Sequence, residues 1–350
     1  MSNLTEPTYK HYSIHALGYL QYLQRFPDYD QEPFMKRLRR CRPRTIGTFN
    51  WCGDPSPGNA YHFKHVPWKM VKADGRLKAD FDQWNPLWED KLIELNQACK
   101  AWDMHDNQIL FMDRYNYHLF KPEWNVQGIN GFFSPEAREV QKKYAVHCME
   151  LAREGRGYSK YKPYLTLCNE PGSRRVDVHR MGHVWAEWHR DIYDAVIPYT
   201  ERQRITVNSS DFCEYAHADL IEPGRCAYWD HPTEPCTHIF GREGQKRDIL
   251  IEGHGVSKLQ SFIEKGFAGI GAWPAHVWSE DGAWENIANK RELFKALDFC
   301  IRTYLNMGKE FYFIGWMFNV EVDGKEDYAD LSRIRWGRLK QFDRVMRRMG

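Results

Sequence analysis

The sequence predicts one α/β domain over residues 1–350, a (β/α)8 TIM barrel with an extra C-terminal strand or hairpin and a helix. Two observations support this fold class. Short runs of β-branched and aromatic residues alternate with amphipathic helical patterns, the order typical of parallel strands joined by crossover helices. Most of these runs are continuously apolar, as expected of strands that are covered on both faces.

Eight barrel strands are expected. They cover residues 12–19, 45–51, 108–113, 164–169, 205–209, 226–229, 249–252 and 269–273. A closed barrel is the economical arrangement for eight parallel strands and their helices. The run 311–322 exceeds the eightfold count, so we expect it to form an extra strand or hairpin after the barrel closes. An Arg-rich amphipathic helix is expected over residues 331–349.

Short polar signals mark where helices begin. Asn85-Pro86 and Ser134-Pro135 each place a capping residue before a proline at the first helical position. His147 lies on the apolar stripe of the helix that Ser134 opens. We expect it to be a hydrogen-bonded histidine at the boundary of the core.

Charge and composition exclude several classes of function. Lys and Arg number 49 against 47 Asp and Glu, so no net field attracts nucleic acid or a membrane surface. No apolar run approaches the roughly 20 residues of a membrane span, and the first residues lack a signal-peptide pattern. We expect no nucleic-acid or membrane partner, and either a cytoplasmic protein or one exported by another route. Nine scattered cysteines without a CxxC pair predict reduced thiols.

Aromatic residues make up 15% of the chain. Many fall in expected loops, among them Trp51, Trp68, Trp84, Trp124 and Trp278. An aromatic-rich core is one explanation; the other is stacking against sugars, which a flat apolar ring beside a polar group suits. The long segment 52–85 favours a cleft for an oligosaccharide or polysaccharide, provided that it lies over the carboxyl ends of the strands.

Polar residues collect directly after the expected strands, where a barrel of this type carries its reacting groups. The most specific end is that of the run 164–169, an apolar strand that terminates abruptly in Asn169-Glu170-Pro171. Three strands farther along the chain, the apolar run 249–252 also ends in a glutamate, Glu252, followed by glycine.

These motifs resemble those of the clan A glycoside hydrolases, the superfamily that includes many cellulases, mannanases, xylanases and β-glycosidases. The resemblance covers roughly residues 10 to 305. It implies that Glu170, after the fourth strand, is the acid/base and that Glu252, after the seventh, is the nucleophile. It also implies a carbohydrate substrate and no cofactor or metal.

The chemistry of glycoside cleavage needs such a pair. The reaction passes through an oxocarbenium-like state, with one protonated carboxyl group at the leaving oxygen and one ionised carboxylate on the other side of the sugar. Two carboxyl groups about 5–5.5 Å apart act as acid/base and nucleophile, and the configuration is retained. We expect Glu170 to be the protonated group and Glu252 to be the ionised one.

The resemblance implies further contacts with substrate. Asn169 would bond the sugar 2-hydroxyl, and Tyr228 or His231 would supply the tyrosine or histidine that follows the sixth strand. Trp273, at the end of the expected eighth strand, would form the floor of the subsite for the cleaved sugar. Additional contacts are expected from His118, Arg114, Trp51 and Trp278.

Two features depart from the clan pattern. The arginine common late in the second strand is replaced by Asn50-Trp51, so Arg114 after the third strand would have to substitute for it. The surround of the expected nucleophile, Ile-Glu-Gly-His-Gly, is also atypical. Asp211 and Glu280 are the alternative nucleophiles.

Two other functions stay open. Asp230-His231, His254 and His276 would suit a metal-dependent hydrolase, although the sequence has neither an HxH after the first strand nor an HExxH motif. The other alternative is a carbohydrate-binding barrel without catalysis, which the presence of both glutamates disfavours.

Overall fold

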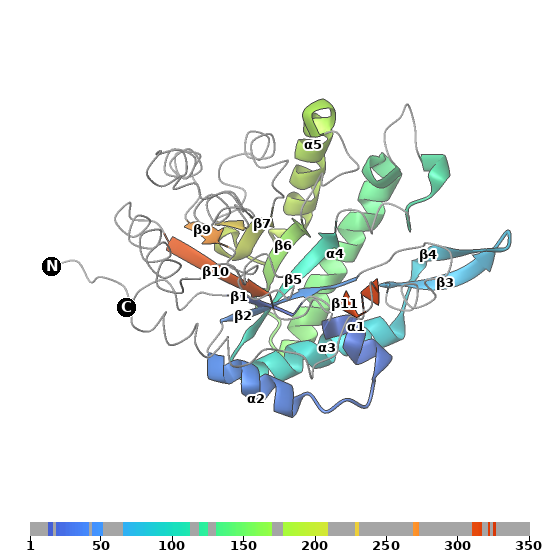
Figure 1. The fold of residues 1–350 in the computed structure, drawn as a ribbon. Coiled ribbons are helices and arrows are strands. Elements are labelled where there is room, and N and C mark those ends of the chain that lie inside the picture. The colour runs from blue at the N-terminus through green and yellow to red at the C-terminus, as the bar shows by residue number, and fades with distance from the viewer. Residues whose placement is uncertain are drawn as a thin grey trace.

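A computed structural model describes residues 13–16, 19–41, 44–51, 66–112, 119–124, 131–169, 178–208, 228–230, 269–272, 310–316, 321–322 and 325–326. Parallel strands with helices packed around them form its centre (Figure 1). The central strands are β1 Ser13–His15, β2 Thr45–Phe49, β5 His105–Met112, β6 Tyr164–Asn169, β7 Ile205–Asn208, β8 Tyr228–Asp230, β9 Gly269–Ala272 and β10 Glu310–Trp316.

Each central strand pairs in parallel with its neighbours in chain order, and β1 pairs with both β2 and β10. The ring of strands is therefore closed. This confirms the parallel, barrel-type sheet. Six of the eight expected strands recur at the expected places, within a few residues at their ends. A seventh, the weakly patterned run 12–19, contains the shorter strand β1.

The order of the last strands in the ring differs from the expected order. In the register, Tyr228 lies opposite Gly269 and Trp229 opposite Ile270, so β8 and β9 are direct neighbours in the ring. The expected strand over 249–252 lies outside the described residues. The run that begins near residue 311 is not an addition after closure. It forms β10, which lies between β9 and β1 and closes the ring. A small hairpin follows, β11 Glu321–Val322 with β12 Lys325–Glu326; the expected helix over 331–349 lies outside the described residues.

Five α-helices are described: α1 Tyr19–Arg25, α2 Glu32–Cys41, α3 Pro86–Ala101, α4 Pro135–Arg156 and α5 Val178–Val196. Short 3-10 helices cover Pro122–Trp124 (η4), Gly131–Phe133 (η5) and Arg202–Arg204 (η6). None of the described helices is long and apolar enough to cross a membrane.

Helix α4 shows how the local signals set its ends. The Ser134 hydroxyl accepts a hydrogen bond from the Ala137 N–H at 3.0 Å, and Pro135 takes the first helical position. Gly157 ends the helix in the left-handed region, with φ of 60°. Near that end, Gly155 lets α4 approach α3 closely, because a Cβ there would lie 2.6 Å from the Ile93 carbonyl oxygen.

The sequence interpretation missed a β-hairpin between β2 and α3. Strands β3 (Trp68–Ala73) and β4 (Arg76–Trp84) pair antiparallel, and Figure 1 shows them projecting away from the barrel. The turn is Asp74-Gly75, and both residues have positive φ, 54° and 72°. An Asp-Gly pair with that geometry is a strong signal for a tight hairpin turn, so the sequence did contain the information.

Candidate active site

The carboxyl ends of the strands define the face where reacting groups are expected. Strand β6 is the fourth in the ring and ends at Asn169, so Glu170 is the first residue after the fourth strand. This is the position that the resemblance requires for the acid/base. The placement of Glu170 itself lies outside the described residues.

The position of the nucleophile is less direct. Because β9 is the seventh strand in the ring, Glu252 belongs to the connection between β8 and β9, rather than to the end of a described strand. The first acidic residue after β9 in the sequence is Glu280, one of the two alternative nucleophiles. Both glutamates lie outside the described residues, as does Asp211.

The corrected strand order also changes which strand ends two aromatic residues are assigned to. Trp273 directly follows β9, so it lies after the seventh strand and not after the eighth. The eighth strand, β10, ends at Trp316, which lies opposite His15 in the register. Sequence reasoning did not consider Trp316 as a site residue because the aromatic run 311–316 was placed outside the barrel.

The remaining expected contacts fall at or beyond strand ends. Tyr228 begins the sixth strand, β8, and His231 follows that strand directly. Arg114 and His118 follow the third strand, β5. Placement of His231, Arg114, His118, Trp273 and Trp278 lies outside the described residues, so their contacts with substrate stay predictions.

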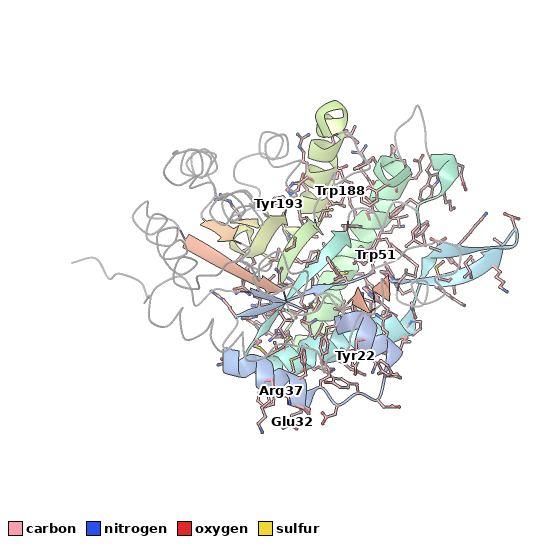
Figure 2. The ribbon with its side chains drawn as sticks, in the orientation of Figure 1. Tyr22, Glu32, Arg37, Trp51, Trp188 and Tyr193 are labelled. Atoms are coloured by element: carbon pink, nitrogen blue, oxygen red, sulfur yellow. The ribbon has the colours of Figure 1, made fainter. Side chains whose placement is uncertain are left out.

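Trp51 is a core residue, which corrects its assignment as a substrate contact. Its side chain has no exposed area, and its indole N–H donates to the Leu110 carbonyl at 2.8 Å. The ring contacts Trp68 and Tyr144 edge-on, at centroid distances of 5.3 and 6.1 Å. Figure 2 shows it among the side chains of the packed interior. A ring enclosed in this way offers no face to a sugar.

The other expected loop aromatics divide into two groups. Trp68 is 1% exposed and belongs to the same packed cluster as Trp51. Trp84 and Trp124 are only partly buried. The core explanation is therefore correct for Trp51 and Trp68, whereas Trp84 and Trp124 keep accessible surface at this end of the barrel.

Asn50 marks the place where the clan commonly has an arginine, and its amide bonds toward the helices. Its Nδ2 donates to Gln108 Oε1 at 2.7 Å and contacts Cys148 Sγ of α4 at 3.2 Å. Its carbonyl oxygen accepts from the Trp88 indole of α3 at 2.7 Å. Asn50 thus joins β2 to α3, α4 and β5, and does not replace the missing arginine.

Asp106 on β5 is a buried acid that the sequence analysis did not single out. Thr48 donates to its carboxylate at 2.8 Å, and Asn96 Nδ2 of α3 lies 3.5 Å from it. Burial raises the pKa of Asp106 to about 7, against the hydrogen bond from Thr48 and the charge of Arg156. Since its neighbours show that it faces α3 and not the strand ends, we assign it to the support of the barrel.

His147 is the satisfied boundary histidine that was expected. It lies 2.7 Å from Glu89 Oε1 through Nε2, and its ring stacks on Trp84 at 4.3 Å. Among the residues that the structure describes, no group of three or more His, Cys, Asp or Glu side chains could hold a metal ion. His231, His254 and His276, named for the metal-dependent alternative, lie outside them.

Comparison with known proteins gave no matching family model and no similar curated sequence. Solved structures do match. An exo-β-1,4-mannosidase from an Opitutaceae bacterium has a TM-score of 0.57 and 14% identity, over 97% of this chain and 60% of the mannosidase. This chain therefore spans less than two thirds of that protein.

Two further matches have more similar lengths. A hyperthermostable endo-1,4-β-D-mannanase from Thermotoga petrophila has a TM-score of 0.58 and 13% identity, over 96% of this chain and 99% of that one. A glycoside hydrolase family 5 mannosidase from Rhizomucor miehei has a TM-score of 0.58 and 9% identity, over 98% and 94%. At these identities the likeness concerns the fold alone: this chain shares the fold of these solved mannosidases and of the mannanase.

Proposed function

We propose that this chain is a retaining glycoside hydrolase that cleaves an oligosaccharide or polysaccharide. The observation that carries the proposal is the position of Asn169-Glu170: Asn169 ends the fourth strand of a closed ring of parallel strands, and Glu170 follows it directly in the sequence. The fold shared with solved mannosidases and mannanases supports it.

Glu170 would protonate the leaving oxygen and then remove a proton from the attacking water. Glu252 would attack the anomeric carbon and form the covalent glycosyl-enzyme intermediate. Asn169 would bond the sugar 2-hydroxyl, where hydrogen bonds strengthen in the transition state. Substrate contacts from His118, Tyr228, His231, Trp273 and Trp278 complete the proposed cleft.

The activity is tested on aryl glycosides and on mannan, glucan and xylan, with the product anomer followed by NMR. Retention of configuration is expected. Inversion would exclude double displacement, and loss of activity in a chelator would favour the metal-dependent hydrolase. Binding of polysaccharide without any cleavage would favour the non-catalytic barrel.

The identity of the nucleophile needs a separate experiment, because in the sequence Glu252 precedes β9, the seventh strand of the ring, and Glu280 follows it. Glu252→Ala and Glu280→Ala are compared with azide as an external nucleophile. Only the variant that lacks the true nucleophile should regain activity, with a glycosyl azide of inverted configuration. Rescue of Glu280→Ala and not of Glu252→Ala would transfer the assignment to Glu280.

A further inference from the structure

The β3–β4 hairpin and the segment 119–124 lie at the end of the barrel that is formed by the carboxyl ends of the strands. The hairpin belongs to the connection after β2, and the segment belongs to the connection after β5. Helices α3 and α4 begin where these connections end, and helices of a parallel barrel begin on the side of the carboxyl strand ends. Since β2, β5 and β6 are consecutive in the ring, both segments are near the carboxyl end of β6, the strand that Glu170 follows in the sequence.

The hairpin has two different faces. In its register, Met70 lies opposite Ala79, and both are partly buried against the core cluster. The alternate positions form the other face, where Lys69 lies opposite Asp80 and donates to Gln83 at 3.1 Å. One face is therefore polar and solvated, and the other continues the apolar surface of the barrel outward.

Three aromatic rings form a stack where the apolar face meets the barrel. Phe81 stacks on Phe120 at 5.6 Å with an interplanar angle of 10°, and on Trp124 at 5.7 Å and 24°. Phe120 is buried, while Phe81 and Trp124 keep part of their surface exposed. The Lys121 ammonium lies 5.0 Å from the centre of the Trp124 ring. The stack therefore ends in the partly exposed indole of Trp124, and the Lys121 ammonium, a hydrogen-bond donor, lies over that ring.

This combination fits a neutral polyhydroxylated chain. A sugar presents an apolar C–H face to an aromatic ring and hydroxyl groups at its edge, which Lys121 and the exposed Glu123 can bond. A lipid surface or a protein helix would need a broad apolar patch. Leu77, 44% exposed, is the one large hydrophobic residue of the described hairpin that is exposed to that degree.

We propose that Phe81, Trp124 and Lys121 form an accessory surface that binds the part of a polysaccharide chain away from the cleaved bond. The inference rests on the proposed function, since it assigns this surface to the same substrate. It implies that long substrates bind through both the strand ends and this surface, whereas an aryl glycoside reaches only the former.

The test compares kcat/KM on polysaccharide with kcat/KM on an aryl monoglycoside. Trp124→Ala should lower the ratio of kcat/KM on polysaccharide to kcat/KM on the aryl monoglycoside about tenfold, because one aromatic stacking contact with the polysaccharide is lost. Trp124→Phe should restore part of it. Tyr158→Ala is the matched control, because Tyr158 is an aromatic residue with 58% exposure just beyond the opposite end of α4. An unchanged ratio in Trp124→Ala would overturn the proposal.

A binding measurement separates this proposal from the proposed function. Glu170→Gln is run in native gels that contain mannan, glucan or xylan, with and without Trp124→Ala. Retardation that disappears with Trp124→Ala supports the surface even if the chain proves to have no hydrolase activity. Equal retardation of both forms overturns it even if hydrolysis is established. If Trp124→Ala does not fold, Lys121→Ala, an exposed position, carries the same comparison with a smaller expected loss.

Discussion

The amino and carboxyl ends of the barrel strands have different surroundings. At the amino ends, guanidinium groups lie over tyrosine rings: Arg204 and Arg44 are 4.7 and 5.5 Å from the centre of the Tyr164 ring. Arg156 lies 4.8 Å from that of Tyr161. At the carboxyl ends of β2 and β5, aromatic rings contact one another, and this aromatic cluster includes the partly exposed Trp84 and Trp124.

This difference separates stability from function. Cation–π contacts and hydrogen bonds join the amino ends of β2, β5, β6 and β7. Among the proposed site residues, Tyr228 of β8 lies at the amino end of its strand. The proposed acid/base, Glu170, follows the carboxyl end of β6 in the sequence, and the proposed accessory surface lies in the connections after β2 and β5. In barrels of this class, the amino end contributes stability and the carboxyl end contributes chemistry. Changes at the two ends should therefore have different effects.

The largest effect is expected at the carboxyl end. Glu170→Gln should lower kcat by about 10²–10⁴-fold, because a general acid/base is removed, while the free energy of unfolding stays close to that of the wild type. Steady-state kinetics and urea unfolding on the same preparations check both parts. A variant that loses stability instead would place Glu170 in the structural support of the barrel.

The next largest effect concerns the pH dependence of stability. The folded pKa of Asp106 is about 7 against an unfolded value of 3.8, so the folded state holds the extra proton. Stability from this group is therefore full below about pH 4 and is lost as the pH rises to about 7. Asp106→Asn should remove this loss, of order 2–4 kcal/mol, and be more stable than the wild type at pH 8.

The pKa shift of His105 changes stability with pH in the direction opposite to that of Asp106, so the experiment must distinguish the two contributions. Burial, with the charges of Arg156, Arg204 and Arg44, lowers its pKa to about 3. The unfolded chain takes up the proton near pH 6.5, so this group costs stability as the pH falls from about 6.5 to 3. Urea unfolding of Asp106→Asn and His105→Gln across pH 4–8 resolves the two. An unchanged pH profile in Asp106→Asn would show that Asp106 is ionised in the folded protein.

A smaller loss of stability is expected where α3 and α4 approach. Gly155→Ala places a Cβ 2.6 Å from the Ile93 carbonyl oxygen and 2.7 Å from Asn96 Cβ. Neither helix backbone can move without repacking, so the free energy of unfolding should fall by about 1–3 kcal/mol. Thermal unfolding measures it. Gly75→Ala in the hairpin turn is the control. Its Cβ would meet open space, so any loss of stability there comes from the positive φ of the backbone and not from a steric clash.

The smallest effect is expected from the amino-end cations. Arg156→Met removes the 2.5 Å hydrogen bond that Nη2 donates to the Met104 carbonyl oxygen, and it removes the contact with the Tyr161 ring. A loss of about 1–2 kcal/mol is expected, with kcat/KM unchanged below the unfolding transition. A change in kcat/KM at constant stability would contradict the separation of the two ends.

Much of the fold was predictable because local signals agreed with the tertiary structure. The strand 164–169 and the start of α4 at Ser134-Pro135 lie where the pattern placed them. The hairpin at Asp74-Gly75 was missed although its turn residues were present. The assignment of Trp51 to substrate was wrong because a tryptophan after a strand can pack inward or outward, and the pattern of the chain does not distinguish the two.

The sequence by itself determined the parallel strands, the helix starts and the fourth-strand position of Glu170, since these depend on period, capping and local order. Only the tertiary structure decided which runs pair. It made 269–272 the neighbour of β8 and used 310–316 to close the ring. Apolar runs of similar composition compete for the same place in a sheet, and the choice depends on register and closure between segments far apart in the chain.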